Sequence, residues 1–101
     1  MIIEVAHIKV LSGHETAFEA AVNKAVQVFA QAKGCLGLHL QRCIENPSEY
    51  EAIIRWETLE DHTEGFRNGP LFQEWRALVG PHFDGPPEVK HYDIAMTRAD
   101  F

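Results

Sequence analysis

The chain has 101 residues, of which 46% are hydrophobic and 24% charged, and its formal net charge at pH 7 is -6. This composition excludes a disordered or fibrous protein, and so short a chain supports one hydrophobic core, so we expect a single domain over residues 1–101. The negative charge and the nine scattered lysines and arginines argue against nucleic acid and anionic membranes as partners.

The first predicted elements are a strand and an amphipathic helix. Residues 2–10 are rich in Ile and Val, which favours a strand. Ser12 and Glu15 have the spacing of a capping box, so we expect a helix from this point to Lys33, with Gly34 ending it. Its predicted apolar stripe consists of Phe18, Ala21, Val22, Ala25, Val26 and Phe29.

A hairpin is predicted over residues 35–57. Residues 35–44 alternate, with Leu36, Leu38, Leu40 and Ile44 on one face, and residues 45–49 have turn chemistry. The second strand of the hairpin places Tyr50, Ala52, Ile54 and Trp56 on one face. Cys35 and Cys43 would lie about 26 Å apart in an extended strand at ~3.3 Å per residue, so we expect no disulfide between them.

An interrupted helix is predicted next. Thr58, three residues before Asp61, is a suitable cap for a helix that runs to about Arg67. Proline is not tolerated inside a helix but is favoured at its first position, so Pro70 starts a second helical segment. The apolar stripe of that segment is Leu71, Phe72, Trp75, Leu78 and Val79. After a Gly- and Pro-rich loop, residues 88–97 alternate as a last strand.

The resulting order, β-α-β-β-α-β, predicts an α+β, ferredoxin-like fold with a four-stranded antiparallel sheet and both helices on one face. We expect the other face to be too apolar for open water, and therefore to pair with the sheet of a second copy in a homodimer. The residues assigned to that face are Ile3, Val5, Ile53, Val89, His7, His39, Arg55 and His91.

Short motifs along almost the whole chain add a family resemblance. They are Gly34-Cys35-Leu36, Arg55-Trp56-Glu57, Pro70-Leu71-Phe72 and Pro86-Pro87-Glu88-Val89 followed by His91-Tyr92. In their order and spacing the chain resembles the antibiotic biosynthesis monooxygenase domain family, which includes quinol monooxygenases. The resemblance implies a dimeric α/β barrel with one pocket per subunit. It also implies oxygenation of an electron-rich quinol, phenol or anthrone with molecular oxygen as co-substrate and no metal or other cofactor.

Aromatic residues around the helix break are the predicted pocket walls. Phe66, Phe72 and Trp75 would enclose a flat ring if the break turns them around one cavity, although aromatic residues at helical spacing are also typical of a core. Leu38 and Trp56 complete the predicted substrate-binding set.

Two histidines are the candidate catalytic residues. His62 lies four residues before Phe66, on the same helix face, and relatives that oxygenate anthrones have a polar residue and an aromatic at this spacing. His62 could accept a phenol proton or bind the resulting anion, or be a half-exposed histidine without a task. His39 could reach a ligand from the second strand, or be satisfied at the barrel interface.

Metal and haem chemistry are not expected. His7, His39, His91 and Asp93 could share a sheet face, but they lack close ligand spacing, and the residue set of haem-degrading relatives is absent as a set. The alternatives that stay open are a non-catalytic dimer that binds a small aromatic ligand and an isomerase of muconolactone type. Without a basic leader or a long apolar run, we expect a cytoplasmic location and no membrane partner.

Overall fold

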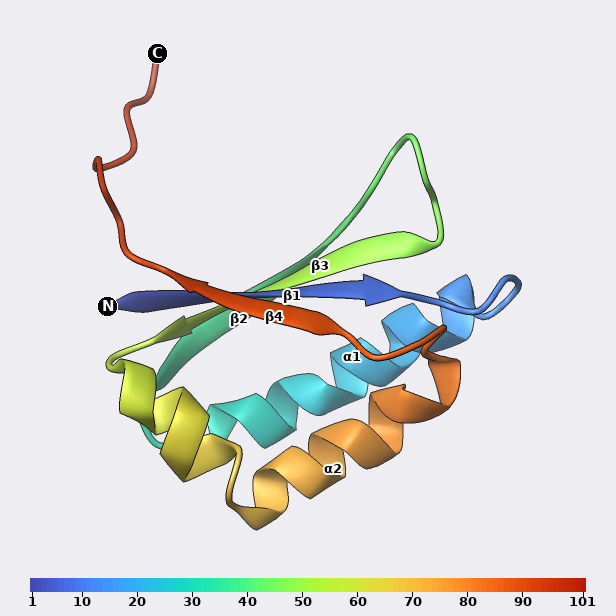
Figure 1. The fold of residues 1–101 in the computed structure, drawn as a ribbon, viewed down its shortest axis with the longest axis horizontal. Coiled ribbons are helices and arrows are strands. Elements are labelled where there is room, and N and C mark those ends of the chain that lie inside the picture. The colour runs from blue at the N-terminus through green and yellow to red at the C-terminus, as the bar shows by residue number, and fades with distance from the viewer.

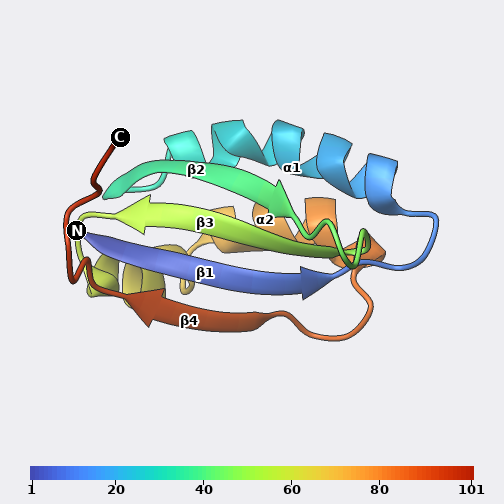
Figure 2. The same ribbon diagram turned by 90° about the horizontal axis from the view of Figure 1, so that it is seen from above.

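The computed structural model describes all residues 1–101 and shows one sheet covered on one face by helices (Figure 1). Four antiparallel strands form the sheet in the order β2-β3-β1-β4, as Figure 2 shows from above. The strands are β1 (Ile2–Lys9), β2 (Cys35–Arg42), β3 (Glu49–Trp56) and β4 (Glu88–Tyr92). The predicted ferredoxin-like α+β fold is confirmed.

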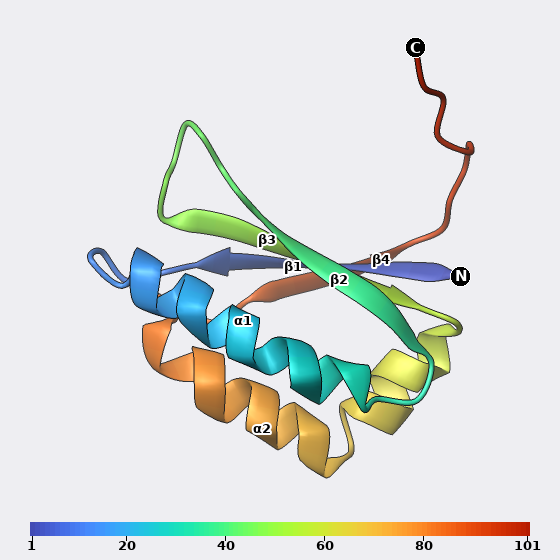
Figure 3. The same ribbon diagram turned by 180° about the vertical axis from the view of Figure 1, so that it is seen from behind.

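The helical layer consists of two helices and two short helical turns. They are α1 (Glu15–Ala30), the π-helical turn η1 (Asp61–Phe66), α2 (Pro70–Val79) and the 3-10 turn η2 (Gly80–His82). Seen from behind, α1 and α2 lie side by side beneath the sheet (Figure 3). No helix is both long enough and apolar enough to cross a membrane.

The start and the stripe of α1 differ from the prediction. The residue at the N-cap is His14, which makes no side-chain cap hydrogen bond. The Glu15 carboxylate instead accepts hydrogen bonds from the Gly13 N–H and the Ser48 hydroxyl, so it ties the helix to the β2–β3 hairpin. Val28 is buried and Val26 is 39% exposed, because the stripe rotates slightly around the helix.

Gly34 connects α1 to the sheet in a conformation that favours glycine. Its φ is +79°, and an added Cβ would overlap the Asp61 carboxylate. The Gly34 carbonyl also accepts a hydrogen bond of 2.7 Å from the Glu57 N–H. Gly34 therefore fixes the approach of η1 to the start of β2. Cys35 and Cys43 are free thiols, in agreement with the prediction.

The register of β4 corrects the predicted faces of the sheet. His91 pairs with Glu4, and Val89 pairs with Ala6. Directly paired residues of antiparallel strands share a face, so Val89 and His91 lie toward the helices and not on the open face. The prediction was wrong because alternation over a five-residue strand shows which residues share a face but not which face is covered.

The start and the end of β2 were also predicted wrongly. A register shift between Cys35 and Gly37 turns Leu36 outward, where it is 47% exposed. The strand ends at Arg42, so Ile44 lies in the connection to β3 and is 88% exposed.

Candidate functional site

A cavity of about 530 Å³ lies between the sheet and the segment that contains η1 and α2. Its volume is in the range of small-molecule sites, roughly 300–1,000 Å³. Ala6 and Ile8 of β1 and Val89 of β4 form its sheet side. Its aromatic lining is Phe29, Phe66, Phe72, Trp75 and Phe83. The cavity is therefore suited to a flat apolar ring.

The helix break shapes this aromatic wall. Gly69 is the N-cap of α2, and Pro70 occupies its first turn, as predicted. The change of direction sets the ring of Phe72 edge-on to Phe66, with centroids 5.9 Å apart. Phe29 stacks on Phe66 at 4.9 Å and meets Trp75 edge-on at 5.0 Å. The break thus places aromatic rings from η1 and α2 around one space.

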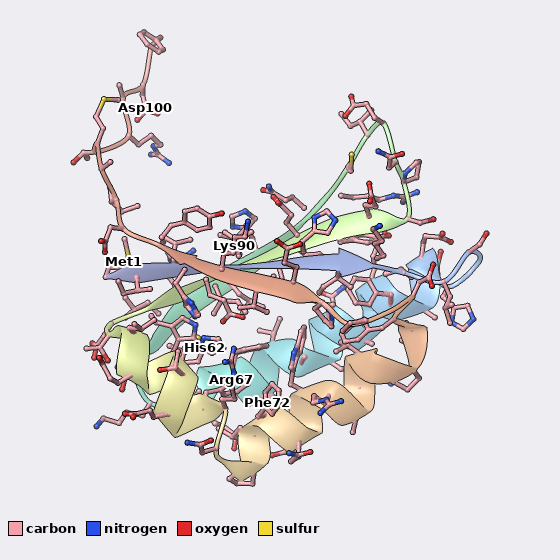
Figure 4. The ribbon with its side chains drawn as sticks, in the orientation of Figure 1. Met1, His62, Arg67, Phe72, Lys90 and Asp100 are labelled. Atoms are coloured by element: carbon pink, nitrogen blue, oxygen red, sulfur yellow. The ribbon has the colours of Figure 1, made fainter.

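The turn before the break is π-helical. The Arg67 N–H donates to the His62 carbonyl, five residues earlier, at 3.0 Å. The Asp61 N–H donates to the Thr58 hydroxyl at 3.1 Å, which confirms the predicted cap. π-Helical turns are rare and occur frequently at functional sites. Figure 4 shows His62, Arg67 and Phe72 beneath β1 and β4.

A buried polar chain runs along the sheet side of the cavity. Glu4 Oε1 accepts a hydrogen bond of 3.0 Å from Trp56 Nε1 and lies 3.2 Å from His62 Nε2. His62 Nδ1 lies 2.8 Å from His91 Nε2. The Trp56 ring stacks on the imidazole of His62, with centroids 5.2 Å apart. Glu4 and His62 are only 5% and 2% exposed, so both side chains are almost completely removed from bulk solvent.

Burial favours the neutral forms of Glu4, His62 and His91. Desolvation raises the pKa of Glu4 to about 7, although the Trp56 hydrogen bond and the positive charge of Arg67 oppose that rise. Burial lowers the pKa of His62 to about 4, and Arg67 and His91 lower it further. The pKa of His91 is also lowered, by burial and by Arg67. His62 is therefore a neutral imidazole at pH 7, and Glu4 is the group that titrates there.

The second carboxylate oxygen of Glu4, Oε2, makes neither of the contacts that hold Oε1. Both contacts of Glu4, to Trp56 and to His62, use Oε1. Every fully buried side-chain nitrogen or oxygen has a hydrogen-bond partner. Since Oε2 has none, it is not fully buried, and because Glu4 lines the cavity, Oε2 is accessible from there. Both ring nitrogens of His62 already have protein partners. Direct proton acceptance by His62 would therefore require breaking one of these contacts.

Four of the predicted site residues lie together and three do not have the expected place. His62, Phe66, Phe72 and Trp75 all line the cavity. Trp56 has no exposed surface and lies behind His62, so it orients Glu4 and His62 and does not form a wall.

Leu38 and His39 lie away from the cavity. Leu38 packs against the core and borders a groove beside Val22 and Val26. His39 pairs with Ile53 on the open face of the sheet, where it is exposed and contacts Gln41 at 3.1 Å. Both residues border that groove at the β2 edge of the sheet, and neither lines the cavity.

Glu4, His91, Arg67 and Arg76 are site residues that sequence reasoning missed. A signal for Glu4 was present: it is the one acidic residue within the first, apolar strand, and it alternates with Ala6 and Ile8. No group of three or more His, Cys, Asp or Glu side chains is arranged to hold a metal ion. The metal ligands considered from the sequence do not meet. Strand β3 lies between the strand of His7 and the strand of His39, and His91 lies on the other face of the sheet.

Comparisons with known proteins agree with this fold. The family model described as antibiotic biosynthesis monooxygenase matches residues 1–78. The crystal structure of a protein from Bordetella bronchiseptica that is assigned as an antibiotic biosynthesis monooxygenase has a TM-score of 0.93 to this chain. The two sequences are 44% identical, and the match covers 94% of this chain and 97% of that one. The uncharacterized protein YczJ of Bacillus subtilis (strain 168) is 38% identical over 91% of this chain and 97% of its own length.

A more distant structural neighbour has a stated chemistry. A mutant of SnoaB, a cofactor-independent oxygenase from Streptomyces nogalater, has a TM-score of 0.81 over 98% of this chain and 97% of that one. At 18% identity this likeness shows a shared fold alone.

Proposed function

The chain belongs to the antibiotic biosynthesis monooxygenase family, and on this basis we propose that it is a cofactor-independent monooxygenase of a small, electron-rich aromatic substrate such as a quinol, phenol or anthrone. The observation that carries the proposal is the free Oε2 of Glu4 in a cavity with aromatic walls. Such a site can hold a ring and remove its proton.

Glu4 is the proposed general base. A base is most effective when its pKa lies near the working pH, and burial raises the pKa of Glu4 to about 7. The substrate hydroxyl would lose its proton to Oε2, while Trp56 and His62 hold Oε1. His62 is thus a positioning residue for Glu4 in this proposal, and it connects the carboxyl group to His91 for proton exchange.

Arg67 is the proposed partner of the substrate anion. It lines the cavity, and its positive charge is felt by Glu4, His62 and His91. A cation at this position favours the phenolate over the phenol. The electron-rich anion then reduces molecular oxygen: one oxygen atom becomes bonded to a ring carbon that loses its hydrogen, and the other oxygen leaves as water with that hydrogen and the proton taken from the substrate, so the ring is left as a quinone or ketone. The aromatic walls exclude bulk water while this occurs.

A homodimer formed through the open face of the sheet is part of the proposal. Ile3, Val5 and Ile53 are half-buried on that face of the single chain. The β2–β3 connection and the residues after β4 rise on the same side of the sheet (Figure 1). A second sheet packed between them would cover these apolar side chains.

A cytoplasmic location remains a prediction.

Oxygen uptake tests the proposed reaction. Purified, chelator-treated protein is mixed with hydroquinones, naphthohydroquinones and anthrones, and the rate is compared with autoxidation. We expect uptake that survives chelation and that falls at least ~100-fold in Glu4→Gln, the loss expected for a general base. Glu74→Gln is the matched control, because Glu74 is exposed and does not line the cavity. No uptake with any of these substrates contradicts the proposal.

A further inference from the structure

Two arginines line the cavity without an ion-pair or hydrogen-bond partner in the protein. Arg67 follows η1 and Arg76 lies in α2, and both are exposed, so they lie where the cavity opens to solvent. The ion pairs of the chain involve other residues, and neither guanidinium donates a side-chain hydrogen bond. Each therefore has its full set of planar N–H donors available to a ligand.

The two guanidinium groups occupy different parts of the cavity wall. Arg67 lies near the polar chain, because its charge affects all three titrating groups there. Arg76 affects none of them and instead lies with its guanidinium carbon 5.9 Å from the centroid of the Phe72 ring. Phe72 and Arg76 are four residues apart in α2 and share one face. Contact with an aromatic ring holds the guanidinium plane in place.

The ionisable lining of the cavity carries a positive charge, although the whole chain has a formal net charge of -6. It consists of Glu4, His62, Arg67 and Arg76. His62 is neutral at pH 7 and Glu4 is partly protonated, so two cations face at most one anion. An anionic ligand could pair with a guanidinium at the mouth of the cavity, whereas a neutral ring could not.

From this arrangement we infer that the ligand is an aromatic acid, a phenolic or quinol ring that carries a carboxylate, with the carboxylate bound by Arg76. The ring lies against Phe66, Phe72 and Trp75, and the hydroxyl faces Glu4 and Arg67. Bidentate pairing with a guanidinium fork suits a carboxylate. The inference rests on the proposed function only for the phenolic part of the ligand, since the carboxylate preference follows from the arginines.

Anaerobic binding separates this inference from the reaction. Matched ligand pairs are hydroquinone with gentisate and naphthohydroquinone with its ring carboxylate, and quenching of Trp fluorescence reports binding because Trp75 lines the cavity. We expect each acid to bind at least ~10-fold more tightly than its neutral partner, since a charge-assisted hydrogen bond is about twice as strong as a neutral one. Added salt should reduce this preference.

Arg76→Gln should remove the preference for the acid and leave binding of the neutral ring nearly unchanged. Arg98→Gln is the matched control, because Arg98 pairs with Asp100 near the carboxyl terminus and should retain the full preference. Equal affinity for acid and neutral ring in the unmodified protein overturns the inference, as does a preference that persists in Arg76→Gln.

The outcome also distinguishes failure of the inference from failure of the proposed function. Selective binding of the acids without oxygen uptake supports the aromatic-acid site and contradicts the oxygenase. Oxygen uptake with neutral quinols alone supports the oxygenase and overturns the inference that the ligand is an aromatic acid. Binding of neither ligand contradicts both.

Discussion

Replacement of Glu4 by glutamine should make the protein more stable and less active at the same time. The side chains have nearly the same shape, so the glutamine oxygen can still accept the hydrogen bond that Trp56 Nε1 donates to Glu4. Glutamine cannot ionise or accept the substrate proton. The change therefore isolates the acid-base chemistry of Glu4 from its packing.

The expected gain in stability follows from the raised pKa of Glu4. Its pKa rises from 4.5 to about 7 on folding, so between these values the folded chain keeps a proton that the unfolded chain has lost. The folded state is therefore progressively disfavoured as the pH rises through this range. A shift of about 2.5 pH units corresponds to about 3 kcal/mol at 1.36 kcal/mol per unit. Glu4→Gln should avoid this cost, which is complete above pH 7 and absent below pH 4.5.

Urea unfolding across pH 4.5–8 measures the difference in the free energy of unfolding between Glu4→Gln and the unmodified chain. The free energy of unfolding of Glu4→Gln minus that of the unmodified chain should rise by about 3 kcal/mol between the acidic and the alkaline end. The titration of His62 occurs in both proteins and largely cancels in the difference. Glu74→Gln should give a difference that does not depend on pH. A pH-independent difference for Glu4→Gln would refute the assignment of a raised pKa to Glu4.

Three further changes test other parts of the structure. His62→Ala should lower oxygen uptake by less than Glu4→Gln does and move the pH profile of kcat/KM, because Glu4 keeps its carboxylate but loses one of the two partners that hold Oε1. Phe72→Ala should raise KM more than it lowers kcat, because it removes a wall of the cavity that binds the ring before and during reaction. Ile53→Asp, on the open face, should convert the proposed dimer to a monomer with correct secondary structure, as seen by light scattering and circular dichroism.

Local chemistry predicted the helix break, because its determinants are close in sequence. The cap at Thr58 and the start of α2 at Pro70 each depend on a few neighbouring residues, and both are present in the structure. The same local rule was wrong at Ser12, since Glu15 there binds Ser48 from the hairpin, a partner that no local pattern reveals. Boundaries set by local hydrogen bonds were thus predictable where no distant residue competed.

The polar chain could not be predicted, because every link in it joins distant segments. Glu4 and Trp56 are 52 residues apart in the sequence, and His62 and His91 are 29 apart. Their meeting depends on the pairing of β4 with β1, which places His91 directly beside Glu4. Alternation within a strand contains no information on this register. His91 was therefore assigned to the wrong face, although its alternation with Lys90 and Tyr92 was evident.

The broken helix divides the site into two tasks. The sheet alone supplies Glu4 and His91 on adjacent strands, and only η1 supplies His62 to connect them. After the break, α2 contributes Phe72, Trp75 and Arg76, which line the cavity but make no contact with Glu4, His62 or His91. In the proposed reaction, proton transfer would therefore depend on η1 and ligand selection on α2. Substitution of Arg76 should change which aromatic acid binds with little effect on the pKa of Glu4, because the charge and the hydrogen bond that act on that pKa come from Arg67 and Trp56. Substitution of Phe72 or Trp75 should also change the burial that raises this pKa.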